Sequence, residues 1–261
     1  MWIRNLPLDY QNQISHFDNL VFLWKTDKVY VMDNHLAAAW CWMQECNADS
    51  RYNFLHIDRH NDLGTGTPFY IYNHLVDNQH LSIDDYTGLN WVNEGNDIRV
   101  KAFLWDNYIT QCSFLFPIWF QDTAFATRTP LDRTEREKLL GVIIQDLSCS
   151  DLLNFIDDNI HIDEDGEQLN NFIGHESRKW IVNLDLDYFY HADANGCFQI
   201  LTDDYISSLA VRLRENQNQI QVLTIALSPE CCGGWNNSIH ALNVFMAAFK
   251  AQNMEFPNEY L

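Results

Sequence analysis

Apolar residues along this chain gather in short continuous runs, and these runs alternate with segments of helical periodicity. Runs with few polar interruptions are typical of strands that are buried on both faces of a sheet. Strands are predicted at residues 19–32 (a hairpin around a Thr-Asp-Lys turn), 53–58, 98–105, 179–189 and 221–227. Helices are predicted at residues 35–46, 151–159, 203–216 and 236–252, and residues 134–147 combine helical with strand-like features.

The alternation of strands and helices predicts an α/β fold with a mostly parallel sheet between two layers of helices, a three-layer α/β/α architecture. The sequence has no internal repeat, low-complexity stretch or linker, so residues 1–261 are expected to form one domain. Asp33 or Asn34 is placed to cap the helix that begins near His35. Functional residues in such a sheet gather at the carboxyl ends of its strands.

The first unusual strand end is NFLHIDRHND, which supplies Asp58, His60 and Asp62. In an extended chain alternate side chains point the same way. These three side chains should therefore share one side of the strand, with Arg59 and Asn61 on the other. The spacing predicts a cluster of two carboxylates and one imidazole at the edge of the sheet.

Two further strand ends carry acids: Asp185 and Asp187 share one side, and Glu230 follows the last strand. An Asp-X-Asp pair alone also fits a solvated strand end or a helix cap. Convergent carboxylates after buried strands, however, repel each other and lose hydration unless a cation neutralises them. With imidazole from His60 and from His35, the donor set suits Mn, Fe or Zn better than Ca or Mg.

The chain has a formal net charge of −20, with 36 acidic and 16 basic side chains. Such a charge repels phosphate backbones, so nucleic acid is not expected as a partner. It attracts metal ions and basic substrates, although acidic surfaces also serve solubility alone. No apolar run is long enough to cross a membrane, and the run at residues 112–120 is expected in the core.

The seven cysteines are odd in number and form no CxxC pair, which predicts reduced thiols in a cytoplasmic protein. The N-terminal residues contain no long apolar stretch, so no signal peptide is expected. Cys231 and Cys232 adjoin Glu230; a reactive thiol is one interpretation, and buried structural cysteines are the commoner one. His56 is expected to support the Asp58 cluster from behind or to pack in the core.

These motifs resemble those of a known group. DRHND (58–62) resembles the DxHxD motif of the arginase and ureohydrolase superfamily, and DLD (185–187) resembles its second metal-binding motif. Together with DNH (33–35) and TIALSPE (224–230), they are similar to an uncharacterised-domain family with the arginase/deacetylase-like fold. Some of its members are peptide arginases, which convert arginine to ornithine during ribosomal peptide biosynthesis. The resemblance spans roughly residues 20–235.

The resemblance implies a role for each matching residue. Asp58 and Asp185 would bridge two Mn ions, and Glu230 would hold a substrate guanidinium. Either Asp62 or His74 would transfer the proton. The remaining ligands would divide between the ions, with His35 and Asp62 on one and His60 and Asp187 on the other.

The sequence also departs from the arginases. Met-Asp-Asn-His (32–35) replaces their Gly-Gly-Asp-His, and the DLD motif lacks a third acid. GTGTPFYIY (64–72) replaces the polar stretch that grips a free amino acid, which predicts arginine within a peptide as the substrate. Two alternatives stay open: a Zn-dependent amide deacetylase, although the chain lacks the His-His pair typical of those enzymes, and an inactive metal-containing peptide-binding protein. The sequence does not predict the oligomeric state.

Overall fold

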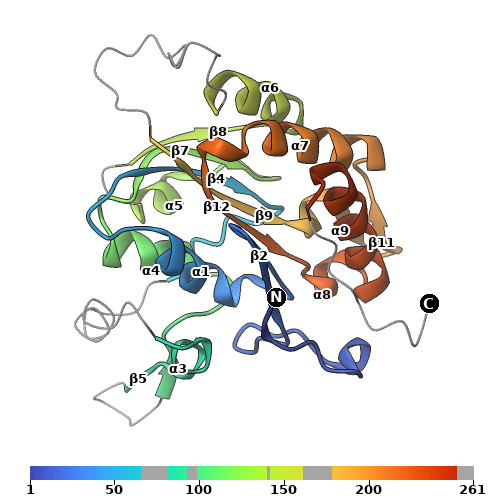
Figure 1. Cartoon of the computed structure of the whole chain (residues 1–261), viewed down its shortest axis with the longest axis horizontal. Helices are drawn as coiled ribbons and strands as arrows, with labels where there is room; N and C mark the ends of the chain where they lie inside the picture. The colour runs from blue at the N-terminus through green and yellow to red at the C-terminus, as the bar shows by residue number, and fades with distance from the viewer. Residues whose placement is uncertain (66–80, 93–98, 140–141, 161–177, 252–261) are drawn as a thin grey trace.

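A computed structural model describes residues 1–65, 81–92, 99–139, 142–160 and 178–251. Its centre is a sheet of eight strands, drawn between two sets of helices in Figure 1. Six neighbouring strands run parallel, and two further strands, each antiparallel to its neighbour, extend the sheet at one edge. The spatial order is β1 (Trp2–Arg4), β2 (Leu23–Thr26), β3 (Val29–Met32), β12 (Ile220–Ala226), β9 (Trp180–Asp185), β4 (Tyr52–Ile57), β7 (Phe120–Ala126) and β8 (Ile143–Asp146).

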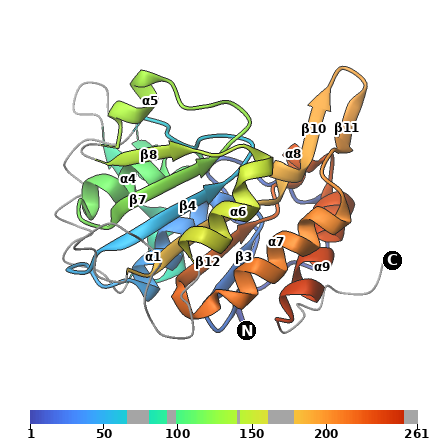
Figure 2. The same cartoon turned by 90° about the horizontal axis from the view of Figure 1, so that it is seen from above.

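Helices cover both faces of this sheet, which confirms the predicted three-layer architecture (Figure 2). One face packs against α6 (Cys149–Asn159), α7 (Asp203–Glu215) and α9 (Trp235–Phe249). The other packs against α1 (Ala38–Glu45) and α4 (Tyr108–Leu115). The shorter elements are η1 (Tyr10–Asn12), η2 (His35–Ala37), α3 (Ile83–Gly88), α5 (Arg133–Glu137), η3 (Leu186–Phe189), β10 (Tyr190–Asp193), β11 (Gly196–Gln199), η4 (Gln217–Gln219) and α8 (Pro229–Cys232).

The central strands follow from their sequences. Every residue of β4 and β9 is buried, as expected for strands with helices on both faces. The predicted hairpin is β2 and β3, which turn at Asp27 with a φ of 48°. In α7 the side chain of Thr202 caps the N-terminus, while Ile206, Leu209 and Leu213 form the buried stripe.

Two predictions for the strands were wrong. The predicted strand 98–105 is reduced to β6 (Arg99–Lys101), which pairs with β5 (Asn90–Val92) outside the main sheet. Its alternating charges, at Arg99 and Lys101, do not fit a strand buried on both faces. Strand β7 was not predicted, because its first residue is the last of the apolar run 112–120, so no separate apolar segment marks where the strand begins. The first four residues of that run, 112–115, end α4, and its last, Phe120, begins β7.

The order of the strands brings distant parts of the sequence to one edge. Strands β3, β12, β9 and β4 are neighbours, and their carboxyl ends lie side by side. From β4 the chain continues outward to β7 and β8, and it then returns to β9 on the other side of β4. Such a reversal opens a crevice at the carboxyl ends. In the part of the chain that the structure describes, the helices are too short or too polar to span a membrane.

Candidate metal centre

A cavity of about 580 Å³ lies at the carboxyl ends of these four strands. Its wall contains five of the six predicted metal ligands, and the sixth, Asp58, lies buried directly behind them. The five are His35, His60, Asp62, Asp185 and Asp187. Glu230 and Cys231 line the same cavity. The fold thus gathers residues separated by almost 200 positions in the sequence.

The deeper part of the cavity contains His35, Asp58, Asp62 and Asp185, which we call the inner group. The Nδ1 atom of His35 lies 2.9 Å from an oxygen of Asp62 and 3.5 Å from one oxygen each of Asp58 and Asp185. The Asn34 side chain accepts a hydrogen bond from the Leu36 amide and so caps η2, as one of the two predicted caps. This cap fixes His35 at the end of β3.

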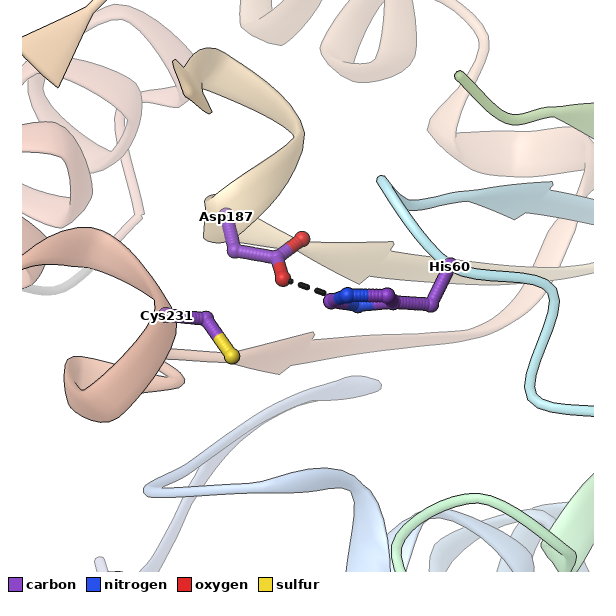
Figure 3. A group of neighbouring side chains, drawn as sticks. All are labelled: His60, Asp187 and Cys231. Atoms are coloured by element: carbon purple, nitrogen blue, oxygen red, sulfur yellow. Dashed lines mark ion pairs between the residues drawn. The ribbon is translucent and has the colours of Figure 1, made fainter. Parts of the chain in front are cut away.

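Nearer the opening lie His60, Asp187 and Cys231, which we call the outer group (Figure 3). The Nδ1 atom of His60 is 3.1 Å from Asp187 Oδ2 and 3.5 Å from Asp58 Oδ1. Asp58 therefore faces both groups, with one carboxylate oxygen toward each. The side chain of His60 is 49% exposed, whereas that of Asp187 is 1% exposed.

The local backbone differs from the predicted extended strand. β4 ends at Ile57, the chain then bends, and Asp62 has a φ of 51°. Asn61 turns away and donates a hydrogen bond to Glu135. Arg59 was expected on the far side, but its Nε lies 3.7 Å from Asp187 Oδ2, and its amide donates to the same carboxylate. The bend allows consecutive residues to reach the site, which strict alternation would not.

The pKa values of the four aspartates shift in two directions. Burial and the nearby carboxylates raise the pKa of Asp58, and burial beside Asp187 raises the pKa of Asp185 to about 7. Burial acts in the same direction on Asp62 and Asp187, but a histidine outweighs it and lowers their pKa values: His35 for Asp62 and His60 for Asp187. Four carboxyl groups thus face only two imidazoles, so all four can be ionised together only when further positive charge is bound.

Two buried oxygens show where further positive charge belongs. Asp58 Oδ2 and Asp187 Oδ2 accept no hydrogen bond from the residues that the structure describes. Asp58 Oδ2 lies near nitrogens of His35 and His56, and Asp187 Oδ2 lies near nitrogens of His60 and Arg59. Asp58 and Asp187 each belong to a set of three residues whose donor atoms lie within 4.8 Å of one another. Buried charges without partners are costly, and cations bound by carboxylate and imidazole remove that cost. The donor set thus fits a pair of divalent metal ions.

A layer of buried polar residues supports the inner group. The Tyr108 hydroxyl donates to Asp62 Oδ2 at 2.9 Å, and the Asn183 side-chain nitrogen donates to that hydroxyl at 3.0 Å. The same nitrogen lies 3.2 Å from His35 Nε2, while Thr224 donates to the Asn183 oxygen at 2.7 Å. Second partners of this kind orient metal ligands.

The residues of this layer differ in how clearly their sequence positions predict them. Asn183 precedes Asp185 by two residues in a strand, so alternation places it on the same side, and it could have been predicted. Tyr108 lies in an apolar stretch and gives no such signal. His56 is fully buried behind Asp58, with its Nε2 3.7 Å from an Asp58 oxygen, and burial lowers its pKa to about 4. It is therefore the neutral supporting residue that the sequence predicted.

Glu230 lies on the short helix α8, which also carries Cys231, and its exposed side chain lines the cavity. The amide of Ser15 donates to its Oε1 at 2.7 Å, and burial of part of the side chain raises its pKa. One of its oxygens is thus held by the protein and the carboxylate faces the opening. His74 and most of the segment 64–72 lie outside the described residues.

The neighbouring thiols are not poised for nucleophilic attack. Burial raises the pKa of Cys231 to about 12, and it raises that of Cys232 as well. Cys232 is fully buried and donates to the Leu227 carbonyl at 3.2 Å, as expected for a structural cysteine. Cys231, in contrast, faces the cavity.

No protein-family model matches this chain, and no curated protein matches it. Among solved structures it is similar to arginases. The arginase of Bacillus caldovelox has 14% identity and a TM-score of 0.49, over 87% of this chain and 69% of that one. For the arginase of Bacillus cereus the values are 14%, 0.48, 87% and 72%, and for that of Entamoeba histolytica they are 11%, 0.46, 85% and 68%. Similarity at this level does not extend to function.

Proposed function

We propose that this protein is a binuclear metal-dependent hydrolase. The observation that carries the proposal is the convergence of four aspartates and two histidines on one cavity. Two of their buried carboxylate oxygens accept no hydrogen bond from the described part of the chain. A structural site would be closed by its ligands. Here the ligands line an open cavity, so a substrate can approach them.

The arrangement of the ligands supports two ions rather than one. Asp58 directs one oxygen to each group, and Asp185 lies beside both His35 and Asp187, so these two carboxylates would bridge the ions. The remaining inner residues would complete one ion and the remaining outer residues the other. We propose Mn²⁺ as the metal that supports activity; when bound, such a pair activates water as a nucleophile at neutral pH.

The proposed substrate is an arginine residue within a peptide. The exposed Glu230 carboxylate would pair with its guanidinium, and the net charge of −20 would attract a basic peptide. Water adds to the guanidinium carbon, and the bond to the side-chain nitrogen breaks, giving urea and an ornithine residue. Asp62, held by Tyr108, would move a proton from the water to the leaving nitrogen. His74 is the other proposed proton carrier.

One experiment tests the reaction and its rivals. The full chain with Mn²⁺ is incubated with an arginine-containing peptide, free arginine, agmatine and an acetyl-lysine peptide. We expect urea and a peptide lighter by the mass of cyanamide, with far slower turnover of free arginine and agmatine. Equal turnover of free arginine would refute the peptide substrate. Release of acetate would identify a deacetylase, and metal binding without any turnover would identify a binding protein.

A further inference from the structure

The outer group contains a third donor that no part of the proposed function uses. The donor atoms of His60, Asp187 and Cys231 all lie within 4.8 Å of one another. Figure 3 shows the Cys231 side chain extending from α8 on the side where the Asp187 carboxylate and the His60 ring form their ion pair. These three donors are a nitrogen, an oxygen and a sulfur, which is a combination that zinc accepts in proteins.

The backbone around Cys231 fixes this orientation. Helix α8 is only four residues long and lies between two residues with positive φ, Ser228 at 42° and Gly233 at 82°. A side chain at Gly233 would place its Cβ 2.7 Å from that of Cys197, so the turn packs directly on β11. The Cys231 carbonyl accepts from Arg59 Nη1 and from the Cys197 thiol, each at 3.4 Å. The carbonyl is thereby held away from the cavity and the thiol faces it.

Asp187 gives an independent indication of a ligand at this point. Its side chain is 1% exposed, and its Oδ2 atom accepts no hydrogen bond within the described residues. This oxygen lies 3.1 Å from His60 Nδ1 and 3.7 Å from Arg59 Nε, and Asp187 belongs to the set of three donor residues. The adjacent Cys232 shows the contrast, because its thiol donates to the Leu227 carbonyl in the core. A bound cation would be shared by the buried Asp187 carboxylate, the His60 imidazole and the Cys231 sulfur.

We propose that Cys231 is a ligand of the outer metal ion and binds it as a thiolate together with His60 and Asp187. The inference rests on the metal-binding part of the proposed function. The sulfur–metal bond forms as the thiol proton passes to solvent, and no oxidant is involved. A thiolate is a soft ligand that favours Zn²⁺ or Co²⁺, whereas the oxygen-rich inner group suits Mn²⁺. The two positions therefore prefer different metals.

Cobalt(II) reports a sulfur ligand directly, through a thiolate-to-cobalt charge-transfer band in the near ultraviolet. We titrate the full metal-free chain with Co²⁺ and record this band alongside the visible bands of bound cobalt. The wild type should show both. Cys231→Ser should bind cobalt without the near-ultraviolet band, while the matched variant Cys232→Ser should keep it. Competition with a chelator should show that Cys231→Ser weakens Zn²⁺ binding by at least about tenfold.

The outcomes separate this inference from the proposed function. Cobalt bound to the wild type without the charge-transfer band, or a band unchanged in Cys231→Ser, would overturn the role of Cys231 and leave the hydrolase proposal standing. No bound cobalt would overturn both. A measurement on the wild type alone guards against a misfolded variant: Zn²⁺ should protect Cys231 from alkylation and leave the exposed Cys149 reactive. Equal reactivity of Cys231 with and without Zn²⁺ would contradict the inference.

Discussion

The inner and outer groups share one cavity but are built differently. In the inner group His35 is 2% exposed, and buried side chains behind it, Tyr108 and Asn183, hold its members. In the outer group His60 is 49% exposed, and its partners come from a 3-10 turn and a four-residue helix. The sheet and the side chains packed on it thus position the inner group, whereas turns at the edge of the sheet carry residues of the outer group. Residues in turns can be substituted without disturbing the sheet. The outer group is therefore the part of this site whose ligands can differ most readily from those of other metal sites.

The strongest test of the two-part site is Asp58→Ala, because this carboxylate faces both groups. We expect loss of both ions and a fall in activity of at least about 100-fold, since even partners of metal ligands can cost that much. Metal analysis of Mn-loaded protein measures the first effect. The exposed Asp49→Ala serves as the control. A variant that retained one full equivalent of metal would show that the groups bind independently.

Glu230→Gln tests the proposed substrate contact separately from metal binding. Glu230 belongs to neither group, so metal content should stay at the wild-type level. Loss of a charge-assisted hydrogen bond costs about 1.5–3 kcal/mol, which corresponds to about a 10- to 150-fold fall in kcat/KM for an arginine peptide. Glu215→Gln, an exposed residue at the end of α7, is the matched control. Wild-type activity in Glu230→Gln would remove the proposed guanidinium contact.

Tyr108→Phe tests whether the inner group depends on its supporting layer. The change removes the hydroxyl that donates to Asp62 and leaves the ring in place. We expect affinity for the inner ion to fall by about tenfold, the lower end of the range for such partners. The cobalt charge-transfer band of the outer group should not change. Equal weakening of both ions would mean that the two groups act as one unit.

The smallest expected effect is that of pH on the stabilisation of the protein by Mn²⁺. Burial raises the pKa of Asp185 from 3.8 to about 7, so protonation of this residue favours the folded metal-free chain. That stability is fully present below the unfolded value and is lost as pH rises through about 7. A metal ion that binds Asp185 must displace the proton of its carboxyl group. The rise in Tm caused by Mn²⁺ should therefore be larger at about pH 8 than at about pH 5.5. A larger rise at the lower pH would contradict this assignment.

The sequence was informative where strands are buried and end in acids. For β4, β9 and β12, continuous apolar runs marked the strands, and the polar residues after them marked the cavity. Strand β7 escaped prediction because Gln121 and Asp122 interrupt its apolar pattern. The alternation argument placed Asp58, His60 and Asp62 together, as the structure does, although the bend after Ile57 brings Arg59 in as well.

The supporting contacts could not be predicted, for a physical reason. The hydroxyl of Tyr108 reaches Asp62 only because α4 packs against the sheet face beside α1. Such contacts depend on packing between segments far apart in the sequence, and local patterns carry no information about them. The orientation of Cys231 likewise depends on two residues with positive φ on either side of it.

The sheet order also has a consequence for the time at which the site forms. β3 and β12 pair directly, with Val29 opposite Leu223, and β12 lies between β3 and β9. During synthesis β3, β4 and β9 leave the ribosome before β12, which separates β3 from the other two in the sheet. Pairing across so long a stretch of sequence is slow, because a large loop must close first. Until β12 enters, β3 and the His35 that follows it are not joined to β9, so we expect the inner group to assemble only in the last steps of folding.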